Sequence, residues 1–290
     1  MSSEPFAIEF RNVSISFEGK RALDDVSFTL ESGHMICITG MSGSGKSVLL
    51  RLAAGLLVPD TGQVLIEGRE IEGLNERELL AVRGSSMGVV FQEQSLFTGM
   101  SVYDNTAYRL DEHGWSEQDT QRAVREILTF VGLEEEVDKL PEELSIGMRR
   151  RLEFARALVG WPKIMLFDEA TAGLDPINAR AMLDLIIRAT ALHRISSLYV
   201  TKEMHEIPYL GTHYVDGDGE GIRKGSSQAG DELNVLLLDE GKIGFYGYWS
   251  EFQSSNLPSV KQMTQPEPGA RIATSYTADP WKTRRTKPLR

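Results

Sequence analysis

The sequence predicts an α/β fold built around a parallel sheet, and two patterns lead to this prediction. Strands that are covered on both faces appear as short, almost continuous apolar runs, and such runs occupy residues 35–39, 87–91, 164–167 and 198–200. Helical periodicities lie between or beside these runs, at residues 46–56, 117–131 and 177–192. Strands that alternate with helices are typical of a parallel-sheet core.

Two further segments predict subdomains around this core. Residues 8–17 and 26–30 mostly alternate apolar and polar side chains, as half-buried strands at a sheet edge do. Residues 95–157 carry mostly helical signals and no convincing strand. We therefore expect a helical subdomain that is inserted into the core.

Helix starts are marked by capping residues. Ser116 and Asp119 form a capping-box sequence ahead of residues 117–131. Asp175 is the predicted N-cap of the helix over 177–192, with Pro176 at its first position.

The C-terminal part predicts a loop, a hairpin and an extension. Residues 216–232 are rich in glycine and charge, which indicates a mobile loop. A hairpin follows at residues 235–239 and 242–246. From about residue 265 the chain is rich in proline and polar groups and ends in WKTRRTKPLR, so we expect little structure there.

Composition narrows the class of function. The formal charge is 31 − 42 = −11, which argues against nucleic acid as the main partner. The single cysteine, Cys37, lies in an apolar run and is expected to be a small core residue in a reducing compartment. The N-terminus lacks the pattern of a secretory signal, and no apolar run approaches the roughly 18 residues of a membrane span. We expect a soluble chain that would serve a membrane process only through a partner.

Glycine is concentrated directly after the first apolar run, in GMSGSGKS at residues 40–47. Glycine weakens a strand interior, so the backbone here must bend or approach something closely. The spacing Gly40-x-x-x-x-Gly45-Lys46-Ser47 between a strand and a helix predicts a phosphate-binding loop. Backbone N–H groups would surround a polyphosphate, Lys46 would reach its β and γ phosphates, and Ser47 would bind Mg²⁺. A purely structural glycine turn is the alternative.

A second, acidic half of such a site follows the strand at residues 164–167. Asp168 and Glu169 stand at its carboxyl end, where open α/β sheets place ligands. Asp168 would hold Mg²⁺ directly or through water, and Glu169 would polarise the attacking water as general base. The alternative is that these acids serve solvation alone.

Residues 144–148, LSIGM, end 20 residues before Asp168 and resemble the LSGGQ signature of the ATP-binding-cassette (ABC) ATPases. Other motifs of that family follow in order. Phe17 matches the aromatic residue that stacks on adenine, and Gln92 matches the Q-loop glutamine. Residues 172–175, AGLD, match the D-loop, and the resemblance covers roughly residues 6–255.

The resemblance implies an ABC-type nucleotide-binding domain over residues 1–255, with a RecA-like parallel-sheet core, an antiparallel β subdomain and a helical subdomain at about 95–157, followed by an extension at 256–290. It implies ATP and Mg²⁺ as ligands and ATP hydrolysis coupled to transport as the activity. The implied catalytic residues are Glu169, Lys46, Gln92 and Lys202, and the implied Mg²⁺ residues are Ser47, Gln92 and Asp168. The implied ATP contacts are Phe17, Gly40, Ser42, Gly43, Ser44, Gly45, Lys46, Ser47, Val48, the D-loop Asp175, and Ser145 and Gly147 from a second copy.

A single set of motifs implies a homodimer. In the family, the signature of a second copy covers the open side of the γ-phosphate. Ser145 and the Gly147 N–H would therefore face the partner's nucleotide, at the start of a helix expected over 148–160. Two ATP molecules would then lie at the interface, and hydrolysis would release the subunits.

Several positions depart from the family pattern. Lys202 replaces the switch histidine, which suggests slow but real hydrolysis, and His205 could substitute for it only if the loop shifted its register. Ile146 stands where glycine is commonest, and Val48 lacks a hydroxyl that often follows Ser47.

Softer signals point to one branch of the family. Residues 90–108, Met148 and residues 257–263 resemble the ATPase of MCE-associated phospholipid transporters, the Mla type. That branch implies an integral-membrane permease as partner, with an MCE-domain protein and a small regulatory subunit as further partners and no nucleic acid. It places the chain peripherally on the cytoplasmic side of the inner (plasma) membrane.

Three surface interpretations accompany this. Leu96, Phe97, Val102 and Tyr103 are expected either to line a groove for a coupling helix of the permease or to pack the subdomain core. Residues 149–151, three arginines, are expected to form a solvated helix face, with a phosphate or lipid-headgroup role as the alternative. The basic tail is expected to be solubilising, or else to contact anionic lipid.

Rival functions stay open at this point. One is an ABC ATPase that powers transport of another substrate, and a second is a soluble ABC ATPase of DNA repair or translation. A third, suggested by Lys202, is an ATP-gated subunit with weak or no turnover. Neither the cargo nor the direction of transport follows from the sequence.

Overall fold

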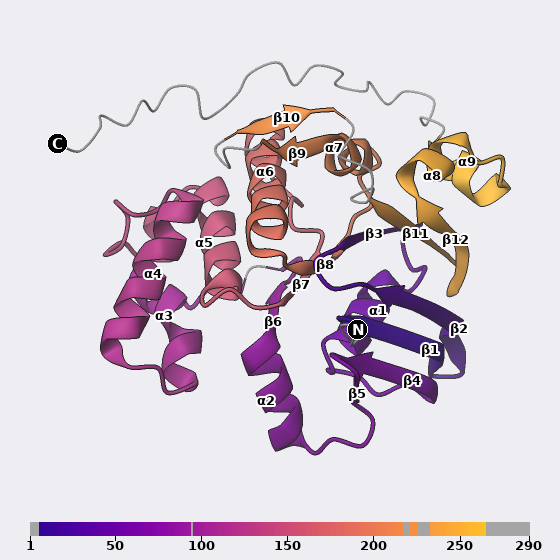
Figure 1. Cartoon of the computed structure of the whole chain (residues 1–290), viewed down its shortest axis with the longest axis horizontal. Coiled ribbons are helices and arrows are strands. Elements are labelled where there is room, and N and C mark those ends of the chain that lie inside the picture. Colours follow the sequence, from indigo (N-terminus) through magenta and orange to yellow (C-terminus); the bar gives the residue numbers. More distant parts are fainter. Residues whose placement is uncertain (1–5, 94, 217–220, 226–232, 265–290) are drawn as a thin grey trace, which may run out of the picture.

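A six-stranded sheet forms the centre of the molecule (Figure 1), in a computed structural model that describes residues 6–93, 95–216, 221–225 and 233–264. Its strands follow the order β12-β11-β3-β8-β7-β6, and all neighbours are parallel except the edge strand β12, which pairs antiparallel with β11. The predicted parallel core is thereby confirmed. The strands are β3 (Met35–Thr39), β6 (Met87–Val90), β7 (Ile164–Asp168), β8 (Ser196–Val200), β11 (Asn234–Asp239) and β12 (Lys242–Tyr248).

Side chains of this sheet alternate between two apolar layers, because successive residues of a strand point to opposite faces. On β3, Cys37 belongs to one buried cluster while Ile36 and Ile38 belong to the other. Both layers exclude solvent, and a fully buried aliphatic side chain of this kind contributes about 1.5–3 kcal/mol. Cys37 is a fully buried core residue, as expected, and burial raises the pKa of its thiol.

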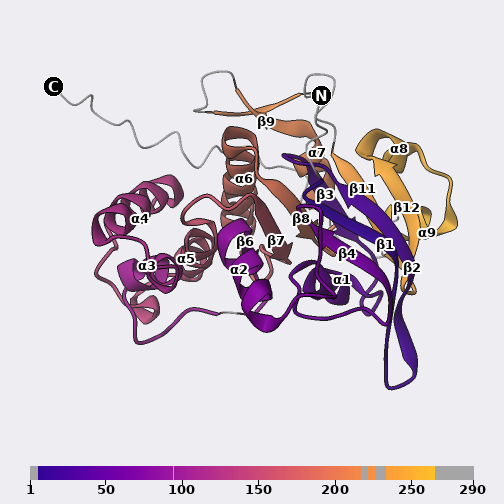
Figure 2. The ribbon, with the colours of Figure 1, turned by 60° about the horizontal axis from the view of Figure 1, so that its bottom comes forward.

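A four-stranded antiparallel sheet, in the order β2-β1-β4-β5, forms a second layer with α1 (Lys46–Ala53) beside it (Figure 2). Its strands are β1 (Ile8–Phe17), β2 (Lys20–Leu30), β4 (Thr61–Ile66) and β5 (Arg69–Glu70). β1 has the predicted bounds. β2 begins six residues earlier than predicted, and β4 was not predicted, because only its last residues are apolar and buried.

The helical subdomain contains α3 (Val102–Glu112), α4 (Glu117–Val131), the 3₁₀ turn η1 (Pro141–Glu143) and α5 (Ile146–Leu158). α2 (Glu76–Ser86) precedes it, a helix that the sequence interpretation missed. α4 has the predicted bounds, but its capping box is incomplete: the Ser116 hydroxyl accepts from the Asp119 N–H and donates to the Asp119 carboxylate. α5 begins at Ile146 rather than at the expected residue 148.

After the core helix α6 (Pro176–His193), capped by Asp175 as predicted, the chain forms α7 (Glu206–Thr212) and a small hairpin of β9 (His213–Val215) and β10 (Ile222–Lys224). The expected loop at 216–232 was therefore wrong at residues 222–224, and residues 217–220 and 226–232 lie outside the described ranges. α8 (Trp249–Ser254) and α9 (Pro258–Thr264) complete the described chain, and the tail predicted from residue 265 lies outside it. Among the described helices, none is long and apolar enough to span a bilayer.

Candidate active site

The strand register brings three predicted motifs to one edge of the central sheet. Val200 of β8 lies opposite Ile38 of β3 on one side and opposite Asp168 of β7 on the other. The glycine loop, the acidic pair and Lys202 follow these positions directly. The glycine loop lies more than 100 residues before the other two motifs in the sequence. All three nevertheless meet at the carboxyl ends of neighbouring parallel strands, where ligands bind in such sheets.

The backbone of the glycine loop packs so closely against neighbouring backbone that there is no room for side chains at Gly40 and Gly45. A Cβ at Gly40 would lie 2.2 Å from the Leu238 carbonyl oxygen, and a Cβ at Gly45 would lie 2.6 Å from that of Ala22. Gly45 adopts φ +107° as the N-cap of α1 and offers no side chain to cap the helix. The first N–H groups of α1 thus lack a side-chain cap from this position, as in helix starts that bind phosphate.

Lys46 is folded back over this loop. Its Nζ donates to the carbonyl oxygens of Gly40 at 2.7 Å and Met41 at 2.9 Å, and the side chain is 7% exposed. Burial lowers the pKa of Lys46, against the raising effect of the charges of Glu169 and Asp168. Within the described residues, the buried hydroxyl of Ser44 has no hydrogen-bond partner. A buried cation and an unpaired hydroxyl in a glycine-wrapped loop fit an oligophosphate, which supplies negative charge and acceptor oxygens.

Ser47, in the first turn of α1, contacts Asp168 at the end of β7. The Ser47 hydroxyl donates to Oδ1 of Asp168 over 3.5 Å. Burial raises the pKa of Asp168, while the bond from Ser47 opposes this. A hydroxyl and a carboxylate are hard oxygen donors, and Mg²⁺ sites of nucleotide enzymes combine one or two such groups with substrate phosphates. The pair therefore fits the predicted Mg²⁺ position.

Glu169 is the meeting point of the two remaining catalytic candidates. Its Oε2 lies 3.2 Å from Nε2 of Gln92 and 2.8 Å from Nζ of Lys202. The bond to Glu169 raises the pKa of Lys202. His205, the possible substitute for Lys202, lies 3.7 Å from the carboxylate of Glu203 instead.

The remaining adenine and loop candidates lie around this centre. Phe17 ends β1 opposite Lys20 and is 44% exposed, on the strand hairpin whose Ala22 contacts Gly45. Ser42 and Gly43 are exposed at the tip of the glycine loop. Val48 packs against the apolar cluster beneath α1. Its side chain therefore contacts the core, where the family often has a hydroxyl that contacts phosphate.

The signature motif lies elsewhere, at the start of α5. Ser145 is exposed and caps α5 by accepting from the Met148 N–H at 3.2 Å. A Cβ at Gly147 would lie 2.3 Å from Oδ1 of Asn178, whose Nδ2 in turn donates to Asp175. That side-chain bond lowers the pKa of Asp175. α1 and α5 lie on opposite sides of β7 and β8 in both views (Figures 1 and 2), so the structure does not bring Ser145 and Gly147 to the glycine loop of the same chain.

The arginine triplet contradicts the expectation of a solvated helix face. Arg150 is 5% exposed and donates to the carbonyl oxygen of Gln92 at 2.9 Å. Arg149 and Arg151 are half-buried and donate to the Leu144 and Val131 carbonyl oxygens. A run of three cations indicates solvent exposure only when no neighbouring backbone supplies acceptors, and loops of the core supply them here.

Glu206 is a buried carboxylate next to the site that the sequence interpretation missed. It is 1% exposed, and its carboxylate accepts from the hydroxyls of Thr171, Tyr199 at 2.8 Å and Thr201 at 2.6 Å. Thr171 follows the acidic pair and Thr201 precedes Lys202, so this carboxylate connects both segments of the site. Its position four residues after Lys202, at the start of α7, gave no signal of burial.

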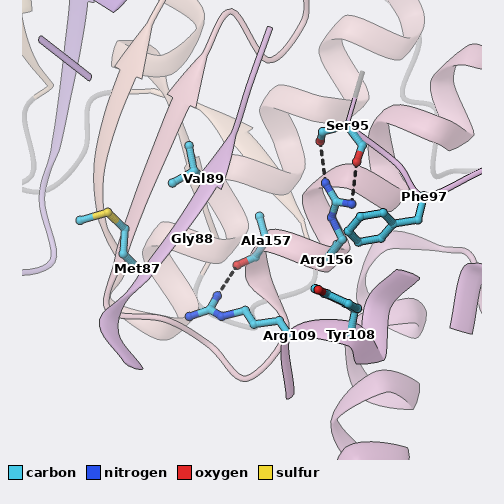
Figure 3. A pocket seen from close by; sticks show the side chains of 9 residues that line it. All are labelled: Met87, Gly88, Val89, Ser95, Phe97, Tyr108, Arg109, Arg156 and Ala157. Carbon is cyan, nitrogen blue, oxygen red and sulfur yellow. Dashed lines mark hydrogen bonds between the residues drawn. The ribbon is translucent and has the colours of Figure 1, made fainter. Parts of the chain in front are cut away.

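A hollow of about 260 Å³ lies next to the Q-loop, between β6 and the helical subdomain (Figure 3). Arg156 lies 5.0 Å from the ring of Phe97, and that ring lies 4.8 Å from the ring of Tyr108. Of the four residues expected at a groove or in the core, Phe97 lines this hollow and Val102 is fully buried. Leu96 and Tyr103 pack partly against the core.

The family model described as ABC transporter matches residues 23–172. The methionine import ATP-binding protein MetN of Leifsonia xyli is 41% identical over 203 residues, which cover 69% of this chain and 59% of that protein. The protein TRIGALACTOSYLDIACYLGLYCEROL 3, chloroplastic, of Arabidopsis thaliana is 38% identical over 263 residues, covering 88% of this chain and 72% of that protein. The chain spans little more than half the length of several curated relatives, such as MetN and the glycine betaine/carnitine protein GbuA of Listeria monocytogenes.

Solved structures agree on the fold. CbiO1 of Clostridium perfringens, described as part of the ABC transporter complex cbiONQ, aligns with a TM-score of 0.74 at 25% identity and covers 87% of this chain and 92% of its own. A dimeric ATP-binding cassette bound to ADP and Pi aligns with a TM-score of 0.70 at 23% identity, covering 83% of this chain and 98% of its own. The predicted nucleotide-binding fold is confirmed.

Proposed function

This chain belongs to the ABC transporter family, and from that premise we propose that it binds and hydrolyses ATP with Mg²⁺ to drive a membrane permease. The observation that supports hydrolysis best is the convergence of Gln92 and Lys202 on one oxygen of Glu169, beside the Ser47–Asp168 pair. A glycine turn with only a structural role would need none of these groups.

The residues have separable tasks. Lys46 leaves the carbonyl oxygens of Gly40 and Met41 and donates to the β and γ phosphates. Ser47, Asp168 and Gln92 would hold Mg²⁺, which would neutralise part of the phosphate charge. Glu169 accepts the proton of the attacking water, and Lys202 exchanges its bond to Glu169 for one to the γ-phosphate.

The signature supports a second copy as partner. Ser145 is exposed at the start of α5, with Ile146 56% exposed beside it. Helix α5 lies on the opposite side of β7 and β8 from α1, the helix that Lys46 begins (Figure 1). In a twofold dimer, Ser145 and the Gly147 N–H of one copy reach the phosphate held by the other, and Asp175 lies at the same interface. Two ATP molecules are enclosed, and their hydrolysis separates the copies.

Lipid is the cargo that we propose, moved by a permease of the MCE-associated kind at the cytoplasmic face of the membrane, with an MCE-domain protein and a small regulatory subunit as further partners. The relative that matches most of this chain's length among those described above is the Arabidopsis protein, whose name is that of a galactolipid. Methionine import is the second candidate, since MetN is 41% identical over a shorter span. The hollow lined by Phe97 and Tyr108 is where we expect the permease to dock.

Affinity purification from solubilised membranes tests this proposal. We expect a polytopic permease to copurify and phospholipid to appear in the eluate, with ATP turnover that Glu169→Gln abolishes. A methionine-binding permease complex would support the second candidate. Ribosomes or DNA in the eluate would support a soluble ABC ATPase, and phosphate release unchanged by Glu169→Gln would support an ATP-gated subunit without turnover.

A further inference from the structure

Arg150 lies inside the protein, one helical turn after the signature residues on α5. An arginine has five N–H donors, and the structure gives this side chain five acceptors. Two of them belong to the Q-loop segment: Nη1 donates to the Phe91 carbonyl oxygen at 3.0 Å and Nη2 to that of Gln92 at 2.9 Å. Arg150 of α5 thus binds the backbone of Gln92, whose side chain donates to Glu169.

Two more acceptors lie in the residues that directly follow β7. Nε of Arg150 donates to the Ala170 carbonyl oxygen at 3.0 Å, and Nη2 lies 3.4 Å from that of Glu169. Glu169 has φ +49°, a conformation that non-glycine residues seldom adopt without support from their surroundings. One guanidinium therefore fixes the main chain of the proposed general base and of the residue that touches it.

The fifth acceptor of Arg150 is the side chain of Glu153, one turn further along α5. Nη1 of Arg150 donates to Oε2 of Glu153 at 2.7 Å, and Oε1 of Glu153 accepts from the Ser95 N–H at 2.9 Å. Arg156, a further turn along, donates to the carbonyl oxygen and the hydroxyl of Ser95 (Figure 3). Three side chains spaced three residues apart on one helix thus hold both ends of the segment after β6.

We infer that Arg150 is a positioning residue for ATP hydrolysis. It fixes the positions of Gln92 and Glu169 relative to α5, the helix that begins at the signature. The inference rests on the proposed function, because it concerns the rate of that reaction. Within the described residues, the hydrogen-bond partners of Arg150 are Glu153 and the backbone of Phe91, Gln92, Glu169 and Ala170. Arg150 therefore acts on the reacting groups through the backbone rather than by contacting phosphate.

Lysine cannot take over this task. It has three donors at a single nitrogen, whereas the guanidinium directs five donors outward within one plane, toward acceptors that surround it. Arg150→Lys keeps the charge opposite Glu153 and loses at least two carbonyl contacts. Arg150→Gln removes the charge as well.

The test measures ATP turnover of the full-length chain carrying Arg150→Lys, Arg150→Gln or Glu153→Gln. Arg151→Lys is the matched control, because Arg151 is the next residue of α5 and its Nη1 donates to the Val131 and Gly132 carbonyl oxygens instead. Rates are divided by the number of nucleotide sites counted by equilibrium dialysis with ADP, so that misfolded protein does not count.

For Arg150→Lys we expect kcat per site to fall about tenfold or more, with KM for ATP and the Kd of ADP within about twofold of wild type. The Mg²⁺ concentration that gives the half-maximal rate should rise, because Gln92 is displaced. A kcat per site within about twofold of wild type in both Arg150 variants overturns the inference. An equal loss in Arg151→Lys overturns it too, and Glu153→Gln decides in the same way if neither Arg150 variant folds.

Hydrogen exchange on the nucleotide-free protein gives a readout without catalysis. Amides of residues 91–93 and 169–172 should exchange faster in Arg150→Lys and at the wild-type rate in Arg151→Lys. Unchanged exchange in Arg150→Lys overturns the positioning role. A wild-type chain that binds ATP without turning it over contradicts the proposed hydrolysis, and the exchange result still decides whether Arg150 holds the two segments.

Discussion

Lys202 and Gln92 share one oxygen of Glu169: Nζ of Lys202 lies 2.8 Å from Oε2, and Nε2 of Gln92 lies 3.2 Å from it. A residue in the position of the family's switch histidine is thus bonded to the proposed base. The carboxylate cannot accept a proton from water efficiently while a cation occupies the same oxygen. Release of Lys202 toward the γ-phosphate would then accompany closure around ATP.

Replacing Lys202 tests this relationship. We expect Lys202→Ala to lower kcat about tenfold, because one donor to the γ-phosphate is lost, and Lys202→His to raise it, because an imidazole can also relay a proton. The measurement is ATP turnover of the purified chain. Lys163→Ala is the control, since Lys163 is an exposed lysine that pairs with Glu67 at 2.6 Å away from the site. If neither Lys202 variant changes the rate, Lys202 has no role.

Replacing Glu169 separates binding from hydrolysis. Glu169→Gln keeps the shape and the bond to Gln92 but cannot accept the proton of water, so we expect turnover to fall about 100-fold or more while ATP still binds. Dimers should accumulate with Mg²⁺ and ATP, and size-exclusion chromatography measures them. A variant that turns over ATP at the wild-type rate would show that Glu169 is not the base.

Asp168 should make the stability of the nucleotide-free protein depend on pH. Burial raises the pKa of Asp168 above its usual value of 3.8. A raised folded-state pKa contributes stability that is fully present at pH values below the unfolded pKa and is lost as pH rises through the folded pKa. We therefore expect Asp168→Asn to raise Tm near pH 7, and this gain to shrink as the pH falls toward 4.

Calorimetry at several pH values, without nucleotide, measures this difference. Mg²⁺-dependent turnover should be lost in Asp168→Asn at every pH. A gain in Tm that is constant between pH 4 and 7 would contradict the assignment to the Asp168 charge.

Glu206 should stabilise the protein strongly. Glu206→Ala leaves the hydroxyls of Thr171, Tyr199 and Thr201 without their common acceptor, and each buried unpaired group costs about 1–3 kcal/mol. We expect the free energy of unfolding to fall by about 3 kcal/mol or more, as measured by urea denaturation. Glu203→Ala, an exposed carboxylate three residues earlier, should change it by less than about 0.5 kcal/mol. A small effect of Glu206→Ala would mean that water replaces the carboxylate.

Local patterns in the sequence determined much of the fold. The apolar runs at β3, β6, β7 and β8 identified the central strands, because a strand covered on both faces admits few polar side chains. Capping residues located the starts of α4 and α6 for the same local reason: a side-chain oxygen satisfies the N–H groups of the adjoining turn. The short strands β5, β9 and β10 gave no such signal, since two or three residues cannot establish a period.

The sequence by itself also determined which residues could handle phosphate and Mg²⁺, because the glycine spacing before Lys46 and the two acids after β7 have few other chemical uses. Only the tertiary structure decided which groups touch: that Lys202 and Gln92 meet at Glu169, and that Arg150 and Glu206 are buried beneath them. A charged residue is buried only where distant segments supply its partners. The four carbonyl partners of Arg150 lie 19 to 59 residues away along the chain, so no local pattern contains them.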